Sequence, residues 1–263
     1  MWGAIIGDLA GSIYEFDQTK QIKSVNINNV IEANSFFSDD TILTIAILDS
    51  FLNDKDYESY LKKYTLEYLD YHPLHKPYFQ KPFSPGFIKW ATGQREGKST
   101  GNGAMMRISP VAYLSDSEEE LIKNTIKATE CSHNSKEAIT NTQIIAKIIY
   151  LAKRGFSKEK IFELLNLHPA YIPFKEFNMT CNATINNCLY AIEASNSFEE
   201  AIRLIITCGG DTDTNACIVG SIAEALYGID NCLIEQAKEK IPPEFTDKLE
   251  KGYSLIKKDY HFW

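Results

Sequence analysis

The sequence predicts an all-α fold that forms one domain, and three observations support this prediction. Apolar residues recur at three- and four-residue spacing along most of the chain, which is the period of a helix with one buried face. Only residues 22–31 (IKSVNINNVI) alternate as a strand would. No low-complexity tract or linker divides the 263 residues. We therefore expect a single domain over residues 1–263.

The first expected helix covers the N-terminal segment, MWGAIIGDLAGSIYE. Its Gly3, Gly7 and Gly11 lie at four-residue spacing, so they form one face without side chains. Such a face predicts close packing against a second helix. Glu15 is the next residue on this face, at the end of the helix. It is a candidate to act in a site beyond the helix, although a glutamate at such an end is also typical of a solvated residue.

Most later helices are expected to be amphipathic, with lysine, glutamate and asparagine between their apolar residues. Ser117 and Ser157 precede two of them as N-cap residues. A last helix is expected from Pro242 to about residue 258, because proline is tolerated in a first helical turn. Residues 72–86 hold four prolines and are predicted to be one long irregular loop. The expected amphipathic helices cover 57–70, 117–130, 135–154, 157–167, 180–195, 198–207 and 230–240.

Two expected helices are apolar on nearly every face, namely residues 41–52 (TILTIAILDSFL) and 215–227 (NACIVGSIAEALY). A helix of this kind belongs in the centre of a helical domain. Each one follows an acidic segment, SDDT at residues 38–41 and DTDT at residues 211–214. Capping explains one such residue per helix. Two aspartates with hydroxyl groups at each helix start exceed that need, and unpaired charge in an interior is costly.

These acidic segments predict a metal site. Carboxylate and hydroxyl oxygens without a cysteine or histidine pattern favour Mg²⁺, Mn²⁺ or Ca²⁺ over zinc or copper. An EF-hand is excluded, because Ala216 and Ile222 stand where its loop requires glycine and glutamate. Four aspartates at two helix starts are instead suited to hold two ions, on the order of 4 Å apart.

Two further segments are candidates for ligand binding. In STGNGAMMR, Gly101 and Gly103 flank Asn102 where a helix should start, and exposed N–H groups at such a turn favour a phosphate. A glycine turn before a helix is common, so this motif alone is weak. The Gly209–Gly210 pair before the second acidic segment is a similar turn. His133 stands between two helical segments, where it either reaches a ligand or caps the junction.

Composition excludes several classes of partner. The net charge of −8 opposes binding to nucleic acid or to an anionic membrane. No apolar run approaches the roughly 18 residues of a membrane span. The N-terminus lacks the basic start of a signal peptide, and Asp8 interrupts its apolar stretch. The six cysteines form no CxxC pair and are predicted to be buried free thiols, so we expect a cytoplasmic protein.

Five segments in this order resemble the ADP-ribosylglycohydrolase family: GAIIGDLAGSIYE, FSDDT, STGNGAMMR, SHNSKEA and GGDTDTNACIVG. The resemblance implies an all-α orthogonal bundle with two Mg²⁺ or Mn²⁺ ions at the bottom of an ADP-ribose cleft. Where the family often has threonine, Ser38 keeps the hydroxyl group. The metal ligands that it implies are Ser38, Asp39, Asp40, Asp211, Asp213 and Thr214. The ADP-ribose contacts that we expect are Thr100, Gly101, Asn102, Gly103, His133, Gly209 and Gly210.

The resemblance also implies a reaction, the hydrolysis of the glycosidic bond between ADP-ribose and a modified protein side chain. The metals would hold the distal ribose and orient a water, and Glu15 or Asp40 would take its proton. The transition state would be oxocarbenium-like. Arginine is the preferred target, because the compact members are most like the arginine-directed ones. ADP-ribosylserine or a small compound such as O-acetyl-ADP-ribose are alternatives, and other classes are a non-catalytic ADP-ribose-binding module and a structural metal protein.

Overall fold

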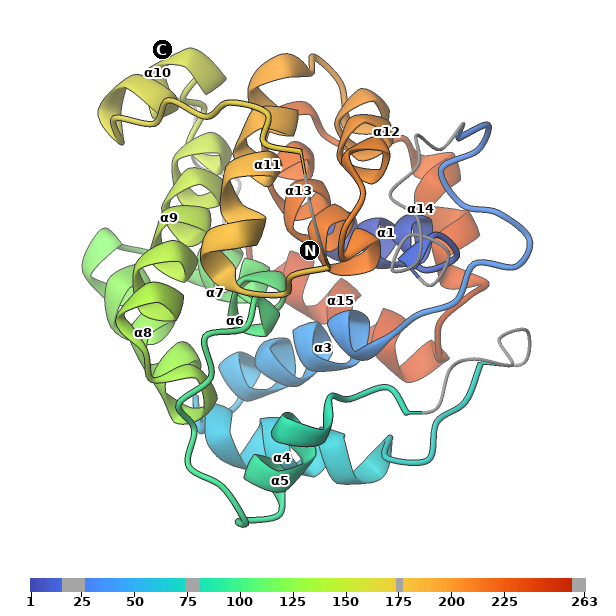
Figure 1. Ribbon diagram of the computed structural model, residues 1–263, viewed down its shortest axis with the longest axis vertical. Coiled ribbons are helices and arrows are strands. Elements are labelled where there is room, and N and C mark those ends of the chain that lie inside the picture. Colours follow the sequence, from blue (N-terminus) through green and yellow to red (C-terminus); the bar gives the residue numbers. More distant parts are fainter. Residues whose placement is uncertain (16–26, 74–80, 174–176, 257–263) are drawn as a thin grey trace.

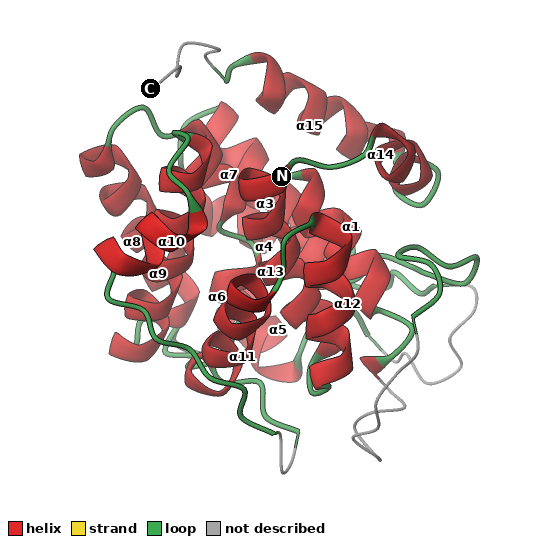
Figure 2. Cartoon of the chain, turned by 90° about the horizontal axis from the view of Figure 1, so that it is seen from above, coloured by secondary structure: helices red, strands yellow, loops and turns green. Residues whose placement is uncertain are grey.

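The computed structural model describes residues 1–15, 27–73, 81–173 and 177–256, and within these ranges the chain is helical with connecting loops and no strand (Figures 1 and 2). The predicted all-α class is therefore confirmed. The helices are α1 (Trp2–Gly11), α3 (Asp39–Leu52), α4 (Tyr57–Glu67), α5 (Pro85–Ala91), α6 (Gly103–Met106), α7 (Ser109–Leu114), α8 (Glu118–His133), α9 (Lys136–Lys153), α10 (Lys158–Leu164), α11 (Cys181–Ala194), α12 (Phe198–Cys208), α13 (Thr212–Tyr227), α14 (Asn231–Lys238) and α15 (Pro243–Ser254).

Helices α1 and α13 form the closest helix pair in the molecule's centre, and the glycine face of α1 is the reason. A Cβ atom added to Gly3, Gly7 or Gly11 would overlap a backbone carbonyl of α13. The hydroxyl of Thr212 donates to the carbonyl of Gly11 at 3.0 Å and fixes the N-terminal end of this contact. Close packing of the glycine face, predicted from the spacing, is confirmed. It carries the end of α1 to the acidic start of α13.

The two all-apolar helices lie in the interior, as predicted. Every residue of α3 from Asp40 to Ser50 is buried, and so is every residue of α13 from Thr212 to Ala223. α13 packs between α1, α9, α11 and α12, while α3 contacts α4, α7 and α15. The acidic residues at the starts of both helices are therefore held within the domain.

Some local predictions need correction. Residues 27–31 form an irregular segment with bends rather than a strand, and residues 22–26 lie outside the described part of the chain. Of the predicted loop over 72–86, residues 74–80 also lie outside it, and Pro85 starts helix α5. The hydroxyl of Ser84 caps α5 by accepting from the N–H of Phe87 at 3.3 Å. The loop prediction relied on the number of prolines and did not recognise this cap. α7 was not predicted, and it also begins with a proline in its first turn.

The six cysteines are free, but two of them are not buried: Cys131 is half-buried and Cys232 is exposed. The exposure of Cys232 follows from its position on the outer face of α14, whose buried residues are Leu233 and Ala237. No helix in the described ranges is long and apolar enough to cross a bilayer.

Candidate active site

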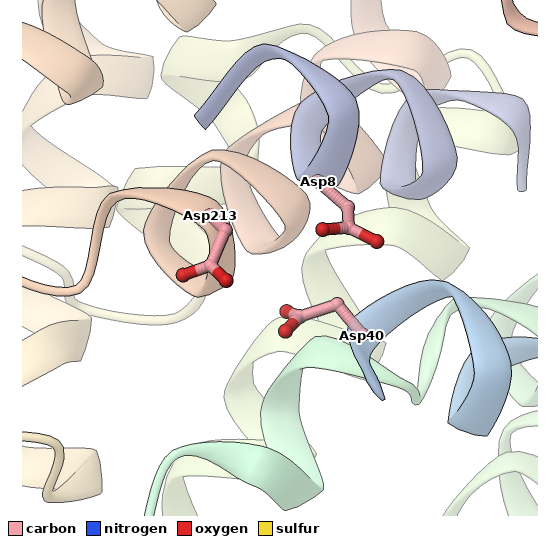
Figure 3. A group of neighbouring side chains, drawn as sticks. All are labelled: Asp8, Asp40 and Asp213. Atoms are coloured by element: carbon pink, nitrogen blue, oxygen red, sulfur yellow. The ribbon is translucent and has the colours of Figure 1, made fainter. Parts of the chain in front are cut away.

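The two acidic segments, far apart in sequence, meet at one place. The hydroxyl of Thr214 donates to the Oδ2 atom of Asp40 at 3.2 Å. One carboxylate oxygen each from Asp8, Asp40 and Asp213 lie within 4.8 Å of one another (Figure 3). A second group, from Glu15, Asp211 and Asp213, meets the same limit. Asp213 belongs to both groups, so these two groups form one continuous cluster between α1, α3 and α13.

A cavity of about 450 Å³ opens onto this cluster. Residues from the acidic cluster that line it are Glu15, Ser38, Asp39, Asp211, Asp213 and Thr214, and the other lining residues include Phe83, Phe87, Gly101, Asn102, Gly103, Arg107 and His133. Most of the predicted site residues therefore share one cavity. Asp40, Thr100, Gly209 and Gly210 are not on its wall, and Asp40 lies buried beneath it in the acidic cluster. A larger cavity of about 760 Å³ lies around Glu224 and Tyr253, and none of the predicted site residues line it.

The glycine pair that precedes α13 has a backbone role. Gly209 and Gly210 both have φ near +79°, a conformation that side chains disfavour, and both are buried. They end α12 and turn the chain so that Asp211 begins α13. The side chain of Asn215 donates to the carbonyl of Gly209 at 3.2 Å and supports this turn.

Asp8 is a residue of this cluster that the sequence analysis did not identify. Its carboxylate accepts hydrogen bonds from the backbone N–H and hydroxyl groups of Ser38 and Thr41, at 2.5–3.0 Å. Asp8 thus caps the N-terminus of α3 from the neighbouring helix α1. The available signal was a single charged residue between Gly7 and Gly11, on a helix that is otherwise apolar.

Burial and mutual repulsion make the cluster unfavourable in its ionised form. Burial raises the pKa of Asp8 to about 6, although four hydrogen bonds oppose the shift. Burial and the nearby carboxylates raise the pKa of Asp40 well above its usual range, and the same causes act on Asp39. The pKa of Asp213 is raised well above its usual range by burial, Glu15 and Asp211. Burial of carboxylates without a compensating cation has this effect.

The donor set fits divalent cations that prefer oxygen ligands. The Oδ1 atom of Asp40 is buried without a hydrogen-bond partner, while its Oδ2 atom accepts from Ser38 and Thr214. A buried carboxylate oxygen normally has a partner. A hard cation would supply one, and it would also offset the repulsion among the surrounding carboxylates. The cluster can therefore hold metal ions.

The Gly101–Gly103 turn is held in place by backbone hydrogen bonds on both sides. The N–H of Cys181 donates to the carbonyl of Thr100 at 2.9 Å, and that of Asn134 donates to the carbonyl of Gly97 at 2.7 Å. The side chain of Asn102 donates to Asp211 at 2.7 Å, which connects the turn to the acidic cluster. The N–H groups of Gly101 and Asn102 already donate to Ser99 and Met179, so neither is a free donor to a ligand.

His133 is the last residue of α8 and is buried against the same turn. An added Cβ atom on Gly103 would lie 3.4 Å from its Nε2 atom. Burial first, and then the neighbouring Arg107, lower the pKa of His133 well below its usual value, so the ring is neutral near pH 7. Phe87 packs over this ring, with 6.3 Å between the ring centroids.

Comparisons with known proteins show which sequences and structures this chain is similar to. The sequence profile of the ADP-ribosylglycohydrolase family matches residues 1–260. The chain is 24% identical to ADP-ribosylarginine hydrolase Tri1 of Pseudomonas putida (strain GB-1), over 94% of this chain and 72% of that protein. It is 22% identical to ADP-ribosylhydrolase ARH3 of Mus musculus, over 87% of this chain and 82% of that protein.

Among solved structures, the fold matches a chain described as an ADP-ribosylglycohydrolase-related protein complex, with a TM-score of 0.68 and 23% identity. The match covers 97% of this chain and 93% of that one, which supports the fold. Because the family profile spans nearly the whole sequence, and the family's helical fold and buried acidic cluster are both present, the chain belongs to the ADP-ribosylglycohydrolase family.

Proposed function

We propose that this protein is a divalent-metal-dependent hydrolase that cleaves the bond between ADP-ribose and a modified protein side chain, with ADP-ribosylarginine as the preferred substrate. The observation that carries the proposal is the cluster of buried carboxylates at the base of a 450 Å³ cavity, with the Oδ1 atom of Asp40 left without a partner. A cavity of this size falls within the range of small-ligand and cofactor sites.

The residues proposed to hold two Mg²⁺ or Mn²⁺ ions are Ser38, Asp39, Asp40, Asp211, Asp213 and Thr214. When bound, such ions would supply positive charge that polarises ribose hydroxyl groups and an attacking water. Asp8 is assigned a supporting role, because its oxygens already accept four hydrogen bonds from Ser38 and Thr41. It fixes the start of α3, and so the positions of Ser38 and Asp40.

The proposed general base is Glu15, with Asp40 as the alternative. Glu15 is half-buried on the cavity wall, and its carboxylate lies within 4.8 Å of oxygens of Asp211 and Asp213. It takes a proton from the water that attacks the anomeric carbon, and the proton then passes to the leaving nitrogen. The bond from that carbon to the side-chain nitrogen breaks. Asp40 is more enclosed and does not line the cavity, which favours Glu15.

The preference for arginine rests on similarity to an ADP-ribosylarginine hydrolase across most of both chains. Serine-linked ADP-ribose and O-acetyl-ADP-ribose remain alternative substrates, because the cavity residues themselves do not select a linkage. Purified protein should be assayed with arginine- and serine-linked ADP-ribosyl peptides, with Mg²⁺ or Mn²⁺ and with chelator. Release of ADP-ribose from the arginine peptide, lost with chelator and restored by metal, is the expected result.

Two variants sharpen this assay. Asp213→Asn removes a carboxylate shared by both acidic groups, whereas Asp247→Asn makes the same change at an exposed position of α15. We expect activity to be lost in the first variant and kept in the second. Activity that persists in full without divalent ions would refute the proposal. Binding of ADP-ribose by calorimetry without any turnover would support a non-catalytic binding module instead.

A further inference from the structure

We infer that Arg107 and Ser132 are positioning residues that hold His133 in one tautomer, with its proton on Nε2, so that the ring presents an N–H donor to the anionic part of the ligand. This inference rests on the proposed function for the identity of that ligand, the diphosphate and ribose of ADP-ribose. It concerns two residues outside the acidic cluster: Arg107, which lines the cavity, and Ser132, which does not.

The first step is a buried chain of hydrogen bonds. The Nη2 atom of Arg107 donates to the hydroxyl oxygen of Ser132 at 2.6 Å. That hydroxyl oxygen lies 2.7 Å from the Nδ1 atom of His133. All three side chains are buried, with 1%, 3% and 4% of their surfaces exposed, so water does not compete for these bonds.

The second step is the count of protons. A guanidinium group can only donate, so Arg107 occupies one lone pair of the Ser132 hydroxyl. The hydroxyl then has one proton to place, and among the described contacts Nδ1 of His133 is the group that can accept it. If Nδ1 donated to the hydroxyl instead, the hydroxyl proton would have no acceptor among these contacts. A neutral imidazole whose Nδ1 atom accepts carries its proton on Nε2. A cation behind the ring also keeps the ring neutral, in line with the lowered pKa of His133.

The third step is where Nε2 lies. It faces the Gly101–Gly103 turn on the cavity wall, at 3.4 Å and 3.8 Å from the positions of added Cβ atoms on Gly103 and Gly101. Because the N–H groups of Gly101 and Asn102 donate within the protein, the turn offers fewer donors than its sequence suggests. The Nε2–H group of His133 makes up for part of this loss.

Arg107 reaches His133 through Ser132 rather than by a direct hydrogen bond. Its Nε and Nη1 atoms are buried and have no hydrogen-bond partner. The guanidinium carbon lies 5.7 Å from the centroid of the Phe87 ring. An unpaired buried cation is costly. Its retention beside the cavity is consistent with a role in orienting a neighbour and in attracting an anion.

The test uses ¹⁵N-histidine NMR of the full chain without ligand, with the His133 signals assigned from a His133→Gln variant. We expect Nε2 to carry the proton in the wild type. In Ser132→Ala both tautomers should be populated, and Ser132→Thr, which keeps a hydroxyl, should restore the single form. Thr129→Ala is the matched control, because it removes a buried hydroxyl of α8 that donates only to the carbonyl of Thr125. Arg107→Met should also mix the tautomers.

Binding is the second readout. Calorimetry should show that Ser132→Ala weakens ADP-ribose binding about tenfold, the equivalent of roughly one hydrogen bond, while Thr129→Ala changes it less than twofold. A wild-type ring protonated on Nδ1, or a Ser132→Ala ring still held in the Nε2 form, would overturn the inference. If ADP-ribose does not bind at all, the proposed function fails. The NMR measurement on the free protein would still decide the inference.

Discussion

Replacing Gly7 by alanine tests the link between the helix contact and the site. An added Cβ atom on Gly7 would overlap the carbonyl of Ala216 and lie 2.7 Å from the backbone nitrogen of Cys217. Ordinary van der Waals contact begins at 3.4 Å. α1 and α13 would thus have to separate by more than about 0.7 Å, because the overlap with the carbonyl of Ala216 is larger than that with Cys217. The nearest atoms are all backbone, so no flexible side chain is present to yield.

The expected loss of stability follows from two opposing effects. Overpacking against rigid backbone costs about 3 kcal/mol. Alanine in a helix gains about 1 kcal/mol over glycine. We therefore expect Gly7→Ala to lower the free energy of unfolding by about 2 kcal/mol, measured by urea denaturation with chelator present. The separation also moves Asp8 away from Asp213, so Mn²⁺ affinity should fall in the same variant.

Gly252→Ala in α15 is the matched control. It is also a buried helical glycine, but its added Cβ atom meets only side-chain ends, those of Leu48 and Met1, at 3.0 Å and 3.2 Å. These ends can move, so the variant should stay within about 1 kcal/mol of the wild type and keep its Mn²⁺ affinity. A Gly7→Ala protein as stable as Gly252→Ala, with unchanged metal affinity, would refute the reasoning.

Three further predictions concern the carboxylates. Asp40→Asn should weaken Mn²⁺ binding at least about tenfold by calorimetry, yet with chelator it should unfold at higher urea than the wild type, because repulsion is relieved. Asp8→Asn should raise metal-free stability less than Asp40→Asn does in the same urea assay, since an amide cannot accept all the bonds that Ser38 and Thr41 donate and this loss offsets the relieved burial cost. Mn²⁺ affinity should fall roughly tenfold per pH unit below about pH 6. The raised pKa of Asp8 and its neighbours means that protons compete with the ion there; constant affinity from pH 7.5 to 5 would contradict this.

Much of the candidate site could be predicted because, at two points of the sequence, charged residues stand directly before a helix that must be buried. Four aspartates at the starts of two all-apolar helices require a shared interior partner, whatever the details of packing. Asp8 could not be predicted in the same way, since a single aspartate in an apolar helix gives no sign of what it caps. That information lies in the contact between α1 and α3. The roles of Arg107 and Ser132 also depend on how α6 meets α8.

The short helices α5 and α7 were missed for a different reason. α5 begins with Pro85 in a proline-rich stretch that resembles a loop when its cap is not recognised, and α7 has Pro110 as its second residue. α5 matters for the site, because Phe87 packs over His133 and Arg107. Periodicity over six or seven residues is too short to separate a helix from a loop.

The close contact between α1 and α13 and the acidic cluster are best understood as one feature. Without a cation, the cluster opposes folding: Asp8 titrates near pH 6 in the fold and near 3.8 in an unfolded chain, so the metal-free fold loses stability as pH rises through that window. A shift of this size corresponds to about 3 kcal/mol at neutral pH. Close backbone packing along the glycine face supplies an opposing contribution that does not depend on pH. A bound cation would remove the cost at its source, so metal should stabilise the wild type more than it stabilises Asp40→Asn.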